Sequence, residues 1–400
     1  MTISRAAPDD ISRKPPTRTL PPTAYTDPEL YADELREVFN RSWQLAGHVS
    51  ELTEPGSYVT VQVGEEPVAV IRGHDGVLRA LSNVCRHRAS LILEGAGVCR
   101  KVMRCPYHAW TYNLDGSLAA APSARGFNDF DRDMVRLPEF RTEVVGGLVF
   151  ACADRAAPPL AELLGPVKPF IEDLGLDNLV VLEREGTDGE NRQVEDYGEN
   201  WKILADNYLE DYHVPIAHPA LVRLLDVKQT DGERNRWSEW SSLPMREKPS
   251  KVEAERRYQG LARRMPGMPE RFERRWGHMC VWPATYFEVY PHHVDSWQLE
   301  PLGLDRTRAR TMTLIHPDAT DRDREAIRLC HELQSEVMDE DIEITTRVQQ
   351  GLRAPSYEAG ILNDEWEPSV IGFQANLRAA LPRIAELERE VAERLSGARR

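Results

Sequence analysis

The sequence predicts an α+β protein of two domains, with an all-β domain near the N-terminus and a larger mixed domain after it. Three observations lead to this prediction. Residues 43–153 contain short runs of alternating apolar and polar residues separated by glycine, such as GSYVTVQV and GVLRALSN. A Pro/Ala-rich joint follows at Asp154–Pro159. Residues 160–400 then combine helical periodicity with a strand-rich middle.

The first 42 residues are predicted to form an arm and a helix that packs on the larger domain. Residues 1–24 are rich in Pro, Arg and Thr without apolar periodicity, which indicates a flexible or surface-hugging arm. A helix is expected over residues 27–39, because Asp27 can cap it and Pro28 suits its first position. The apolar face of this helix would consist of Leu30, Leu35, Val38 and Phe39.

The larger domain, residues 154–400, is expected to be strand-rich between about Cys280 and Ile315. The polar stretch from Glu233 to Arg275 is interpreted as a mobile insertion or lid. The last twenty residues predict a helix used for packing or subunit contact rather than catalysis. The apolar positions at helical spacing in this helix are Leu381, Ile384, Leu387, Val391 and Leu395.

The composition is that of an acidic globular protein. Its 400 residues include 50 Lys and Arg against 65 Asp and Glu, a formal charge of -15 that argues against a nucleic-acid partner. The longest apolar runs, such as Val68–Ile71 and Val144–Ala151, are far shorter than the roughly 20 residues of a membrane span. The first residues lack the apolar segment of a secretory signal, so we expect no membrane association and a cytoplasmic location.

The strongest motif pairs cysteine with histidine in the segment NVCRHRASLILEGAGVCRKVMRCPYHAW. One residue separates Cys85 from His87, and two separate Cys105 from His108. Two thiolates and two imidazoles fit a Rieske [2Fe–2S] centre, in which His replaces Cys on one iron and raises the reduction potential. The alternative is a Cys2His2 zinc site, whose ligands usually pair Cys with Cys and His with His along the chain. Here each loop supplies one Cys and one His, which favours the Rieske centre.

A second group of metal-binding residue types lies in NWKILADNYLEDYHVPIAHPAL. His213 and His218 are five residues apart and would diverge by about 140° on a regular helix. Pro215 lies between them and breaks the helix, so both imidazoles can face one metal ion. Two imidazoles and one carboxylate, with open positions, form the facial triad of non-haem Fe(II) oxygenases. Structural histidines in a loop are the alternative for this pair on its own.

Both motifs resemble those of one family. Residues 43–153 are similar to the Rieske domain of ring-hydroxylating and related oxygenases, and the His213/His218 segment is similar to their catalytic domain. The resemblance extends from about Asp27 to about Phe373 and implies a terminal oxygenase α subunit whose catalytic domain has a central antiparallel sheet covered by helices. Respiratory Rieske proteins carry an extra Cys in each cluster loop, whereas Cys99 has no counterpart near His108. That subclass is disfavoured, and Cys99 is expected to be a structural thiol.

The resemblance also implies the third ligand of a mononuclear Fe(II). Asp341, in the segment MDEDIEITTRVQQGL, matches the family's carboxylate ligand. Its neighbours Asp339 and Glu340 are alternatives from the sequence.

Further site residues precede the two histidines. Glu210 matches the acid that, in these oxygenases, bridges an iron-ligating His to a cluster His of the neighbouring subunit. Many members have Asp there, and Glu is shared with some oxygenases of quaternary ammonium compounds such as carnitine. Asp211 is the alternative for this role. Asn207 is expected near the iron and Asp206 beside the same ligands, or both on the helix surface.

The family also implies the partners. We expect a homotrimer in which the cluster of one subunit supplies electrons to the iron of the next, and a separate reductase or ferredoxin. No Gly-rich dinucleotide fingerprint follows a strand in this sequence, so NAD(P)H and flavin would act indirectly through that partner. The sequence leaves open whether a small β subunit joins the trimer.

The substrate is open between two classes. One reaction is hydroxylation of an N-methyl carbon of a quaternary ammonium compound followed by loss of formaldehyde, favoured by Glu210 and by aromatic residues that can surround a cation. The other is hydroxylation or cis-dihydroxylation of an aromatic ring in an apolar pocket. A third hypothesis is that the protein is a pure electron carrier that uses only residues 43–153. The aromatic residues considered, most of them expected in the core, are Trp276, Trp282, Tyr286, Phe287, Tyr290 and Trp297.

Overall fold

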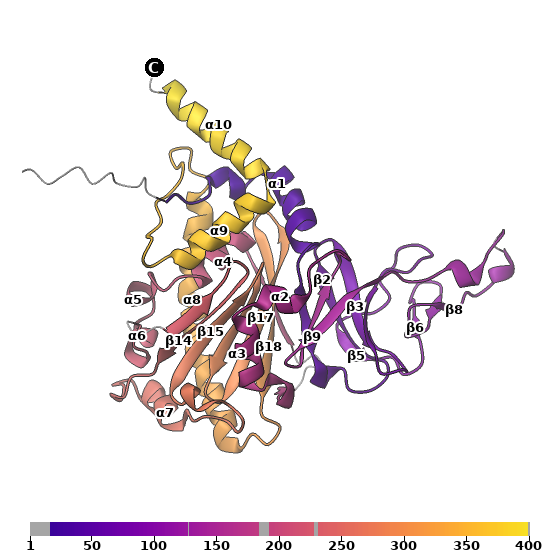
Figure 1. Cartoon of the computed structure of the whole chain (residues 1–400), viewed down its shortest axis with the longest axis horizontal. Helices are drawn as coiled ribbons and strands as arrows, with labels where there is room; N and C mark the ends of the chain where they lie inside the picture. The colour runs from indigo at the N-terminus through magenta and orange to yellow at the C-terminus, as the bar shows by residue number, and fades with distance from the viewer. Residues whose placement is uncertain (1–16, 127, 184–191, 228–230, 399–400) are drawn as a thin grey trace, which may run out of the picture.

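A computed structural model describes residues 17–126, 128–183, 192–227 and 231–398. An all-β domain lies beside a larger domain of sheet and helices, as Figure 1 shows. The predicted α+β class is confirmed. No helix in the described part of the chain is both long enough and apolar enough to cross a membrane.

The β-domain is built on a seven-stranded antiparallel sheet. In spatial order its strands are β1 (Gln44–His48), β10 (Leu148–Cys152), β9 (Glu139–Val145), β4 (Leu78–Ser82), β3 (Glu66–Arg72), β2 (Ser57–Val63) and β5 (Ala96–Val98). Burial alternates strictly along β2, which follows from the apolar and polar alternation of SYVTVQV. A smaller sheet contains β6 (Met103–Arg104), β7 (Thr111–Tyr112) and β8 (Leu118–Ala120).

The larger domain is organised around an eight-stranded antiparallel sheet. Its strands are β11 (Val180–Val181), β18 (Arg306–Ile315), β17 (His293–Gly303), β16 (Thr285–Tyr290), β15 (Arg275–Val281), β14 (Ser238–Pro244), β13 (Asp231–Arg234) and, paired to β18, β12 (Arg192–Tyr197). The strand-rich middle predicted between Cys280 and Ile315 is therefore confirmed.

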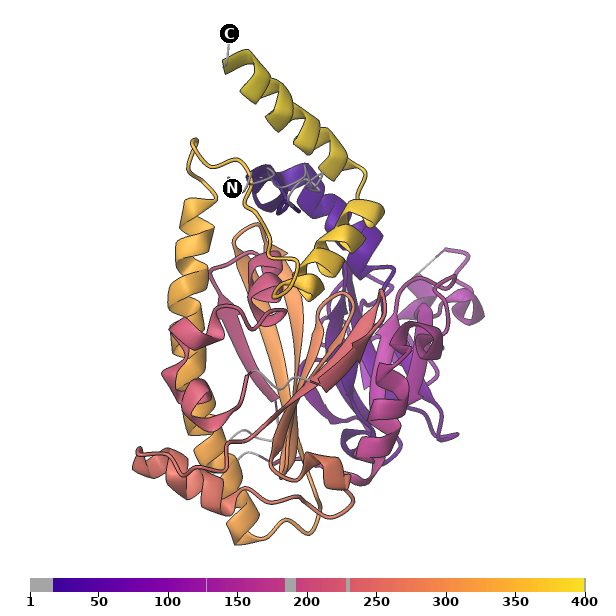
Figure 2. The same ribbon diagram turned by 60° about the vertical axis from the view of Figure 1, so that its left-hand side comes forward.

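Helices surround this sheet, and the longest, α8, runs beside it on the side away from the β-domain (Figure 2). The α-helices are α1 (Pro28–Asp33), α2 (Leu160–Leu164), α3 (Val167–Leu174), α4 (Trp201–Tyr208), α5 (Val214–Ala217), α6 (Pro219–Leu224), α7 (Glu253–Leu261), α8 (Asp321–Gly351), α9 (Pro368–Ala380) and α10 (Arg383–Ala398). A π-helical stretch, η2 (Glu34–Phe39), continues α1. Short 3-10 turns are η1 (Pro22–Tyr25), η3 (Val49–Glu51), η4 (Ala124–Gly126), η5 (Arg132–Met134), η6 (Leu176–Asn178) and η7 (Glu270–Phe272).

The N-terminal helix forms as its sequence predicts. The Asp27 carboxylate accepts hydrogen bonds from the backbone N–H groups of Glu29 and Leu30, both at 2.8 Å, and Pro28 is the first helical residue. Phe39 meets Trp201 of α4 edge-on, with ring centroids 4.8 Å apart, so the helix packs on the larger domain. Residues 1–16 of the expected arm lie outside the described residues, and Leu20 in its described part is fully buried.

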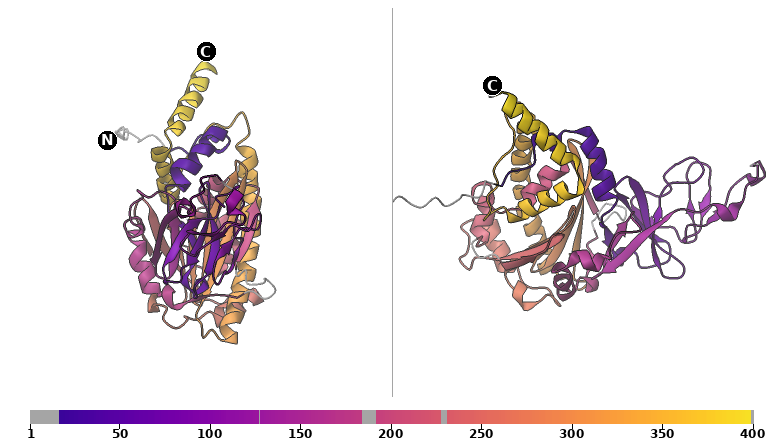
Figure 3. Two further views of the ribbon diagram at one scale, coloured as in Figure 1. Left: turned by 90° about the vertical axis from the view of Figure 1, so that its right-hand side faces the viewer. Right: turned by 45° about the horizontal axis from the view of Figure 1, so that its top comes forward.

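The expected lid over residues 233–275 is wrong in its first part. Residues 238–244 form β14, which pairs with β15 inside the large sheet. Ser242 and Leu243 are buried there, so this segment is part of the scaffold. The predicted C-terminal helix is α10, which carries the buried Ile384 and Leu387 and extends away from the body (Figure 3). Leu381 is also buried but ends α9 and does not belong to α10. The side chain of Leu395 lies outside the described ones.

The two domains share a core and a buried hydrogen-bond pair. Gln298 on β17 donates from Nε2 to Gln44 Oε1 at 2.8 Å and accepts from the backbone N–H of Leu45 at 3.1 Å. Phe150 of β10 and Phe287 of β16 belong to one buried apolar cluster. Apolar burial across this boundary fixes the β-domain against the sheet.

Candidate metal centres and the cavity between sheet and helices

Two loops of matching backbone geometry carry the Cys/His motif. The N–H groups of Cys85 and Cys105 donate to the carbonyls of Ser90 and Trp110, each five residues on, at 2.9 and 2.8 Å. Their own carbonyls accept from Ala89 and Ala109, at 3.0 and 3.1 Å. Both alanines have a positive φ, 56° and 57°, which closes the two loops tightly.

The two thiols are buried, each with about 2% of its residue surface exposed. Burial alone would raise the pKa of Cys105, but hydrogen bonds from the Tyr107 backbone N–H and with the Cys85 thiol lower it below its ordinary value. The Tyr112 hydroxyl lies 3.3 Å from Cys85 Sγ and accepts from the Arg86 N–H at 2.9 Å. This environment favours the thiolate of Cys105, the form in which cysteine binds iron.

The two histidines of the motif lie beside one another. The rings of His87 and His108 have centroids 4.6 Å apart at 76°, and Trp110 stacks on His87 at 4.9 Å. Tyr107 covers His108 and is itself 54% exposed. Two buried thiols and two adjacent imidazoles in the β-domain fit the donor set of a Rieske cluster.

His213, His218 and Asp341 come together although Asp341 lies on a distant helix. The ligand atoms of all three lie within 4.8 Å of one another. His218 Nε2 is 3.1 Å from His213 Nε2 and 3.1 Å from Asp341 Oδ1, and His213 Nε2 is 3.5 Å from Asp341 Oδ1. Pro215 begins the short helix α5 between the histidines, and α8 supplies Asp341. Two imidazoles and a carboxylate at this spacing fit a mononuclear Fe(II).

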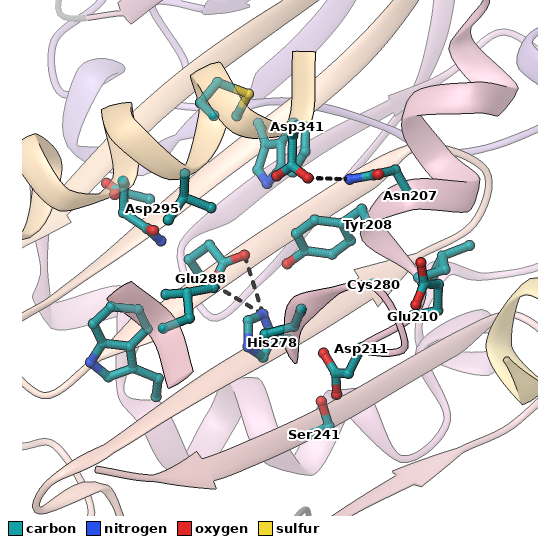
Figure 4. A pocket seen from close by; sticks show the side chains of 18 of the residues that line it. Asn207, Tyr208, Glu210, Asp211, Ser241, His278, Cys280, Glu288, Asp295 and Asp341 are labelled. Carbon is teal, nitrogen blue, oxygen red and sulfur yellow. Dashed lines mark hydrogen bonds and ion pairs between the residues drawn. The ribbon is translucent and has the colours of Figure 1, made fainter. Parts of the chain in front are cut away.

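Each of these three side chains contacts a polar side chain that orients it. Glu210 lies 2.6 Å from His213 Nδ1, and Glu340 lies 2.8 Å from His218 Nδ1. Asn207 on α4 donates to Asp341 Oδ1 at 2.8 Å, as Figure 4 shows. Carboxylates behind imidazoles fix the tautomer that leaves Nε2 available for a metal ion. Sequence reasoning named Glu340 only as a competing ligand and missed this contact.

The structure places the side chains of Asp211 and Asp206, the other two acids named from the sequence, away from the iron-site histidines. Asp211 faces the cavity instead of His213, so Glu210 is the acid beside that imidazole. Asp206 turns away from the site: it accepts from the Tyr25 hydroxyl at 2.8 Å and from Gln374 Nε2 at 3.0 Å. Burial raises the pKa of Asp206 to about 7. The expectation that Asp206 supports the iron ligands is therefore wrong, because α4 points Asn207 and not Asp206 toward Asp341.

A cavity of about 1150 Å³ opens beside this group, between the large sheet and helices α4 and α8. Charged side chains line its sheet side, which sequence reasoning also missed. His278 on β15 lies 3.0 Å from Glu288 Oε2 on β16 (Figure 4). Glu239 on β14 also lines the cavity. Burial alone lowers the pKa of His278, but Glu288, Asp211 and Glu239 outweigh it and raise the pKa to about 9.

Only part of the aromatic set reaches the cavity. Trp276, Tyr290 and Trp297 are among its lining residues, together with Tyr208 and Trp240. The remaining aromatic residues of the predicted set, Trp282, Tyr286 and Phe287, pack in or against the apolar clusters. Tyr208 and Trp297 meet edge-on with ring centroids 4.9 Å apart, so the cavity combines aromatic surfaces with negative charge.

Two family models match the chain. Residues 42–139 match the Rieske [2Fe-2S] domain, and residues 178–383 match the catalytic domain of the ring hydroxylating alpha subunit. The carnitine monooxygenase oxygenase subunit of Acinetobacter pittii is 30% identical over 372 residues, which cover 89% of this chain and 91% of that protein. The glycine betaine monooxygenase oxygenase subunit of Chromohalobacter salexigens is 29% identical, covering 92% and 87%.

A solved structure agrees with these matches. A quaternary ammonium Rieske monooxygenase, described in terms of carnitine oxidation by gut microbiota and inter-subunit electron transfer, superposes with a TM-score of 0.76 at 26% identity. The match covers 94% of this chain and 98% of that one.

Proposed function

The chain belongs to the Rieske ring-hydroxylating oxygenases, and from this premise we propose that it hydroxylates an N-methyl carbon of a small quaternary ammonium compound. As a member it is an oxygenase that uses O2, a small organic substrate and electrons from a reductase. Its cofactors are a Rieske [2Fe–2S] cluster and a mononuclear non-haem iron.

The substrate proposal rests on the charged side chains that line the sheet side of the cavity. Glu239 and Glu288 face the cavity from adjacent parts of the sheet with Asp211 nearby, and His278 is the cation set among them. The single positive charge of His278 cannot balance all three carboxylates, so an aromatic hydrocarbon would leave the others without water or a counter-charge, at a cost of several kcal/mol. A fixed cation is attracted by them and by the faces of aromatic rings.

We assign the cofactors to the residues described above. Cys85, His87, Cys105 and His108 would hold the cluster, and the mononuclear iron would be held by His213, His218 and Asp341. When bound, the cluster delivers electrons and the mononuclear iron activates O2.

The chain's own residues then have supporting roles. Glu210 and Glu340 fix the two imidazoles, and Asn207 orients the Asp341 carboxylate. The carboxylates of the cavity hold the ammonium group so that one methyl faces the ligand side chains, and the aromatic lining excludes water.

The overall chemistry balances without a further co-reactant. One O2, two electrons and two protons convert an N-methyl group into N-hydroxymethyl and one water. The N-hydroxymethyl product breaks its N–C bond, releasing formaldehyde and leaving the protonated tertiary amine. Formaldehyde is therefore the diagnostic product of this reaction.

Subunit assembly is part of the proposal. We assign a homotrimer in which Glu210 bridges His213 to a cluster histidine of the neighbouring subunit. The relative described with inter-subunit electron transfer supports this arrangement. The domain division at residues 1–42, 43–153 and 154–400 belongs to the same proposal. A reducing, cytoplasmic setting suits a chain whose six cysteines are all unpaired.

The test is oxygen uptake and formaldehyde release with a generic reductase across carnitine, glycine betaine, choline and aromatic acids. Formaldehyde in proportion to oxygen with at least one quaternary amine is expected. Uptake coupled to an aromatic diol without formaldehyde would identify a ring hydroxylase instead. His213→Ala with an intact cluster spectrum is expected to lose turnover, and full activity in that variant would point to an electron carrier.

A further inference from the structure

We infer that a second divalent metal ion binds between strand β17 and helix α8, held by His293, Asp295 and His331. The ligand atoms of these three residues lie within 4.8 Å of one another. Two imidazoles and one carboxylate form a donor set suited to Zn2+ and similar transition-metal ions. The group lies outside the residues assigned to the cluster and to the mononuclear iron.

The geometry repeats that of the first three-residue group. His293 Nε2 and His331 Nε2 lie 3.2 and 3.1 Å from the same oxygen, Asp295 Oδ2. Their rings have centroids 5.2 Å apart at 83°. For His213 and His218 the corresponding values are 5.0 Å and 84°. Both groups therefore direct two perpendicular imidazoles and one carboxylate oxygen at a common point.

Polar neighbours hold the proposed ligands from behind. The Thr313 hydroxyl donates to Asp295 Oδ1 at 2.6 Å, which leaves Oδ2 turned toward the imidazoles. His292 Nδ1 lies 2.6 Å from His293 Nδ1, so the second nitrogen of the His293 ring is also engaged. Such contacts behind the ligands are usual at metal sites and orient the nitrogen that binds the ion.

The position of the group indicates what the ion does. His331 and Asp341 are both on α8, ten residues or roughly 15 Å apart along the helix, so the two groups are too distant for a dinuclear centre. His293 and Asp295 belong to β17, and a shared ion would tie α8 to the large sheet. It would thereby hold in place the helix that carries Asp341. His331 is 40% exposed in its side chain, which gives an ion a route of entry.

A network of hydrogen bonds is the competing account. In that account both Nε2 atoms carry protons and donate to Asp295 Oδ2, and no ion binds. The two accounts differ in the number of ions per chain, which is measurable without substrate or activity.

The experiment uses the untagged full chain with its cluster intact, after a chelator has removed mononuclear metals under anaerobic conditions. Titration with Co2+, followed by its visible absorption and by elemental analysis, is expected to give two ions per chain. His331→Ala and His213→Ala are each expected to bind one, and the double variant none. His74→Ala, which changes an exposed histidine of the β-domain, is the control and is expected to bind two.

Thermal unfolding supplies a second readout. Zn2+ is expected to raise the melting temperature of His213→Ala, where only the second site is left, and not that of the double variant, because an ion that binds the folded chain stabilises it. One Co2+ per wild-type chain, or two in His331→Ala, would overturn the inference. The number of Co2+ ions bound per wild-type chain tests the inference even if a variant folds poorly.

Discussion

His278 and Glu288 face each other across strands β15 and β16, with Nδ1 3.0 Å from Oε2. The two residues are direct cross-strand partners, so the register of the sheet sets this contact. Their neighbours on the same face are Trp276 and Cys280 on β15 and Tyr286 and Tyr290 on β16, all of them buried. The pair gives the sheet side of the cavity a charged surface.

Replacing Glu288 by Gln is expected to raise KM for a quaternary ammonium substrate roughly tenfold, since loss of ~1.4 kcal/mol of binding corresponds to a factor of ten. The reason is loss of one carboxylate that attracts the ammonium group. Steady-state oxygen uptake measures the change. A neutral tert-butyl analogue, which has the shape without the charge, is expected to inhibit wild type and variant equally.

Glu332→Gln is the matched control for this change. Glu332 is an exposed acid on α8 that pairs with Arg328, away from the cavity, and its loss should leave KM unchanged. Equal KM in wild type and Glu288→Gln, while formaldehyde is still released, would reject the role of Glu288 without rejecting N-demethylation.

His278 is expected to make substrate affinity depend on pH. With a pKa of about 9 its imidazolium neutralises part of the charge of Glu239 and Glu288 at neutral pH. As the pH rises through about 9 this positive charge is lost, and the cavity becomes more negative by one unit. Tyr208 on α4 stays neutral, because burial raises its pKa well above the ordinary value. KM for a quaternary ammonium ion, whose charge does not titrate, is therefore expected to fall.

Rate profiles against pH for wild type and His278→Gln measure this effect. The fall in KM should be absent in the variant, which has no titrating group at that position. A fall of the same size in both proteins would assign the effect to another group.

A feature of the fold or of the site can be predicted from the sequence when its residues lie close together along the chain. Cys85, His87, Cys105 and His108 lie within a single 24-residue stretch, where spacing alone indicates the cofactor. The segment Ser238–Pro244 was misassigned because its polar flanks conceal a strand that forms only by pairing with β15. His278 and Glu288 escaped notice because their meeting depends on strand register, which no short pattern determines.

The three consecutive acids of α8, Asp339, Glu340 and Asp341, are a second case in which the sequence alone does not identify the ligand. Successive residues on a helix turn by about 100°, so one of three neighbours faces a given point. Asp341 faces the histidines, Glu340 reaches the far side of His218, and Asp339 is exposed. The choice depends on the rotation of α8 against the sheet, which the sequence of the segment does not contain.

Glu340→Ala is expected to weaken metal binding at the His213, His218 and Asp341 group by about 10- to 100-fold, the usual effect of removing a carboxylate behind a histidine ligand. The His218 ring would lose the partner that fixes its orientation. Iron content relative to the cluster, measured under limiting Fe2+, follows the change. Asp339→Asn is the neighbouring control with no expected loss, and loss of iron in that variant would move the ligand assignment from Asp341 to Asp339.

Tyr112→Phe is expected to lower the reduction potential of the cluster. Hydrogen bonds to the cluster sulfurs are among the features that set this potential, and the Tyr112 hydroxyl is 3.3 Å from Cys85 Sγ. Protein-film voltammetry measures the shift. Tyr107→Phe removes only the hydroxyl of an exposed ring that lies tilted against His108 and keeps the backbone N–H that bonds to Cys105, so its potential should stay at the wild-type value. Equal potentials for all three proteins would exclude Tyr112 as a determinant.

Breaking the ion pair of Glu34 and Lys202 is expected to destabilise the attachment of the N-terminal helix. Lys202 Nζ lies 2.6 Å from Glu34 Oε1, both side chains are essentially unexposed, and Trp201 Nε1 donates to Glu34 Oε2 at 2.8 Å. Glu34→Ala leaves a buried ammonium without its partner, which costs about 3–5 kcal/mol of unfolding free energy. Replacing both residues by apolar ones, Glu34→Leu with Lys202→Met, removes that isolated charge and should restore most of the loss. Denaturant unfolding of the single and double variants measures both effects, and a double variant as unstable as Glu34→Ala would show that packing, not the uncompensated charge, causes the destabilisation.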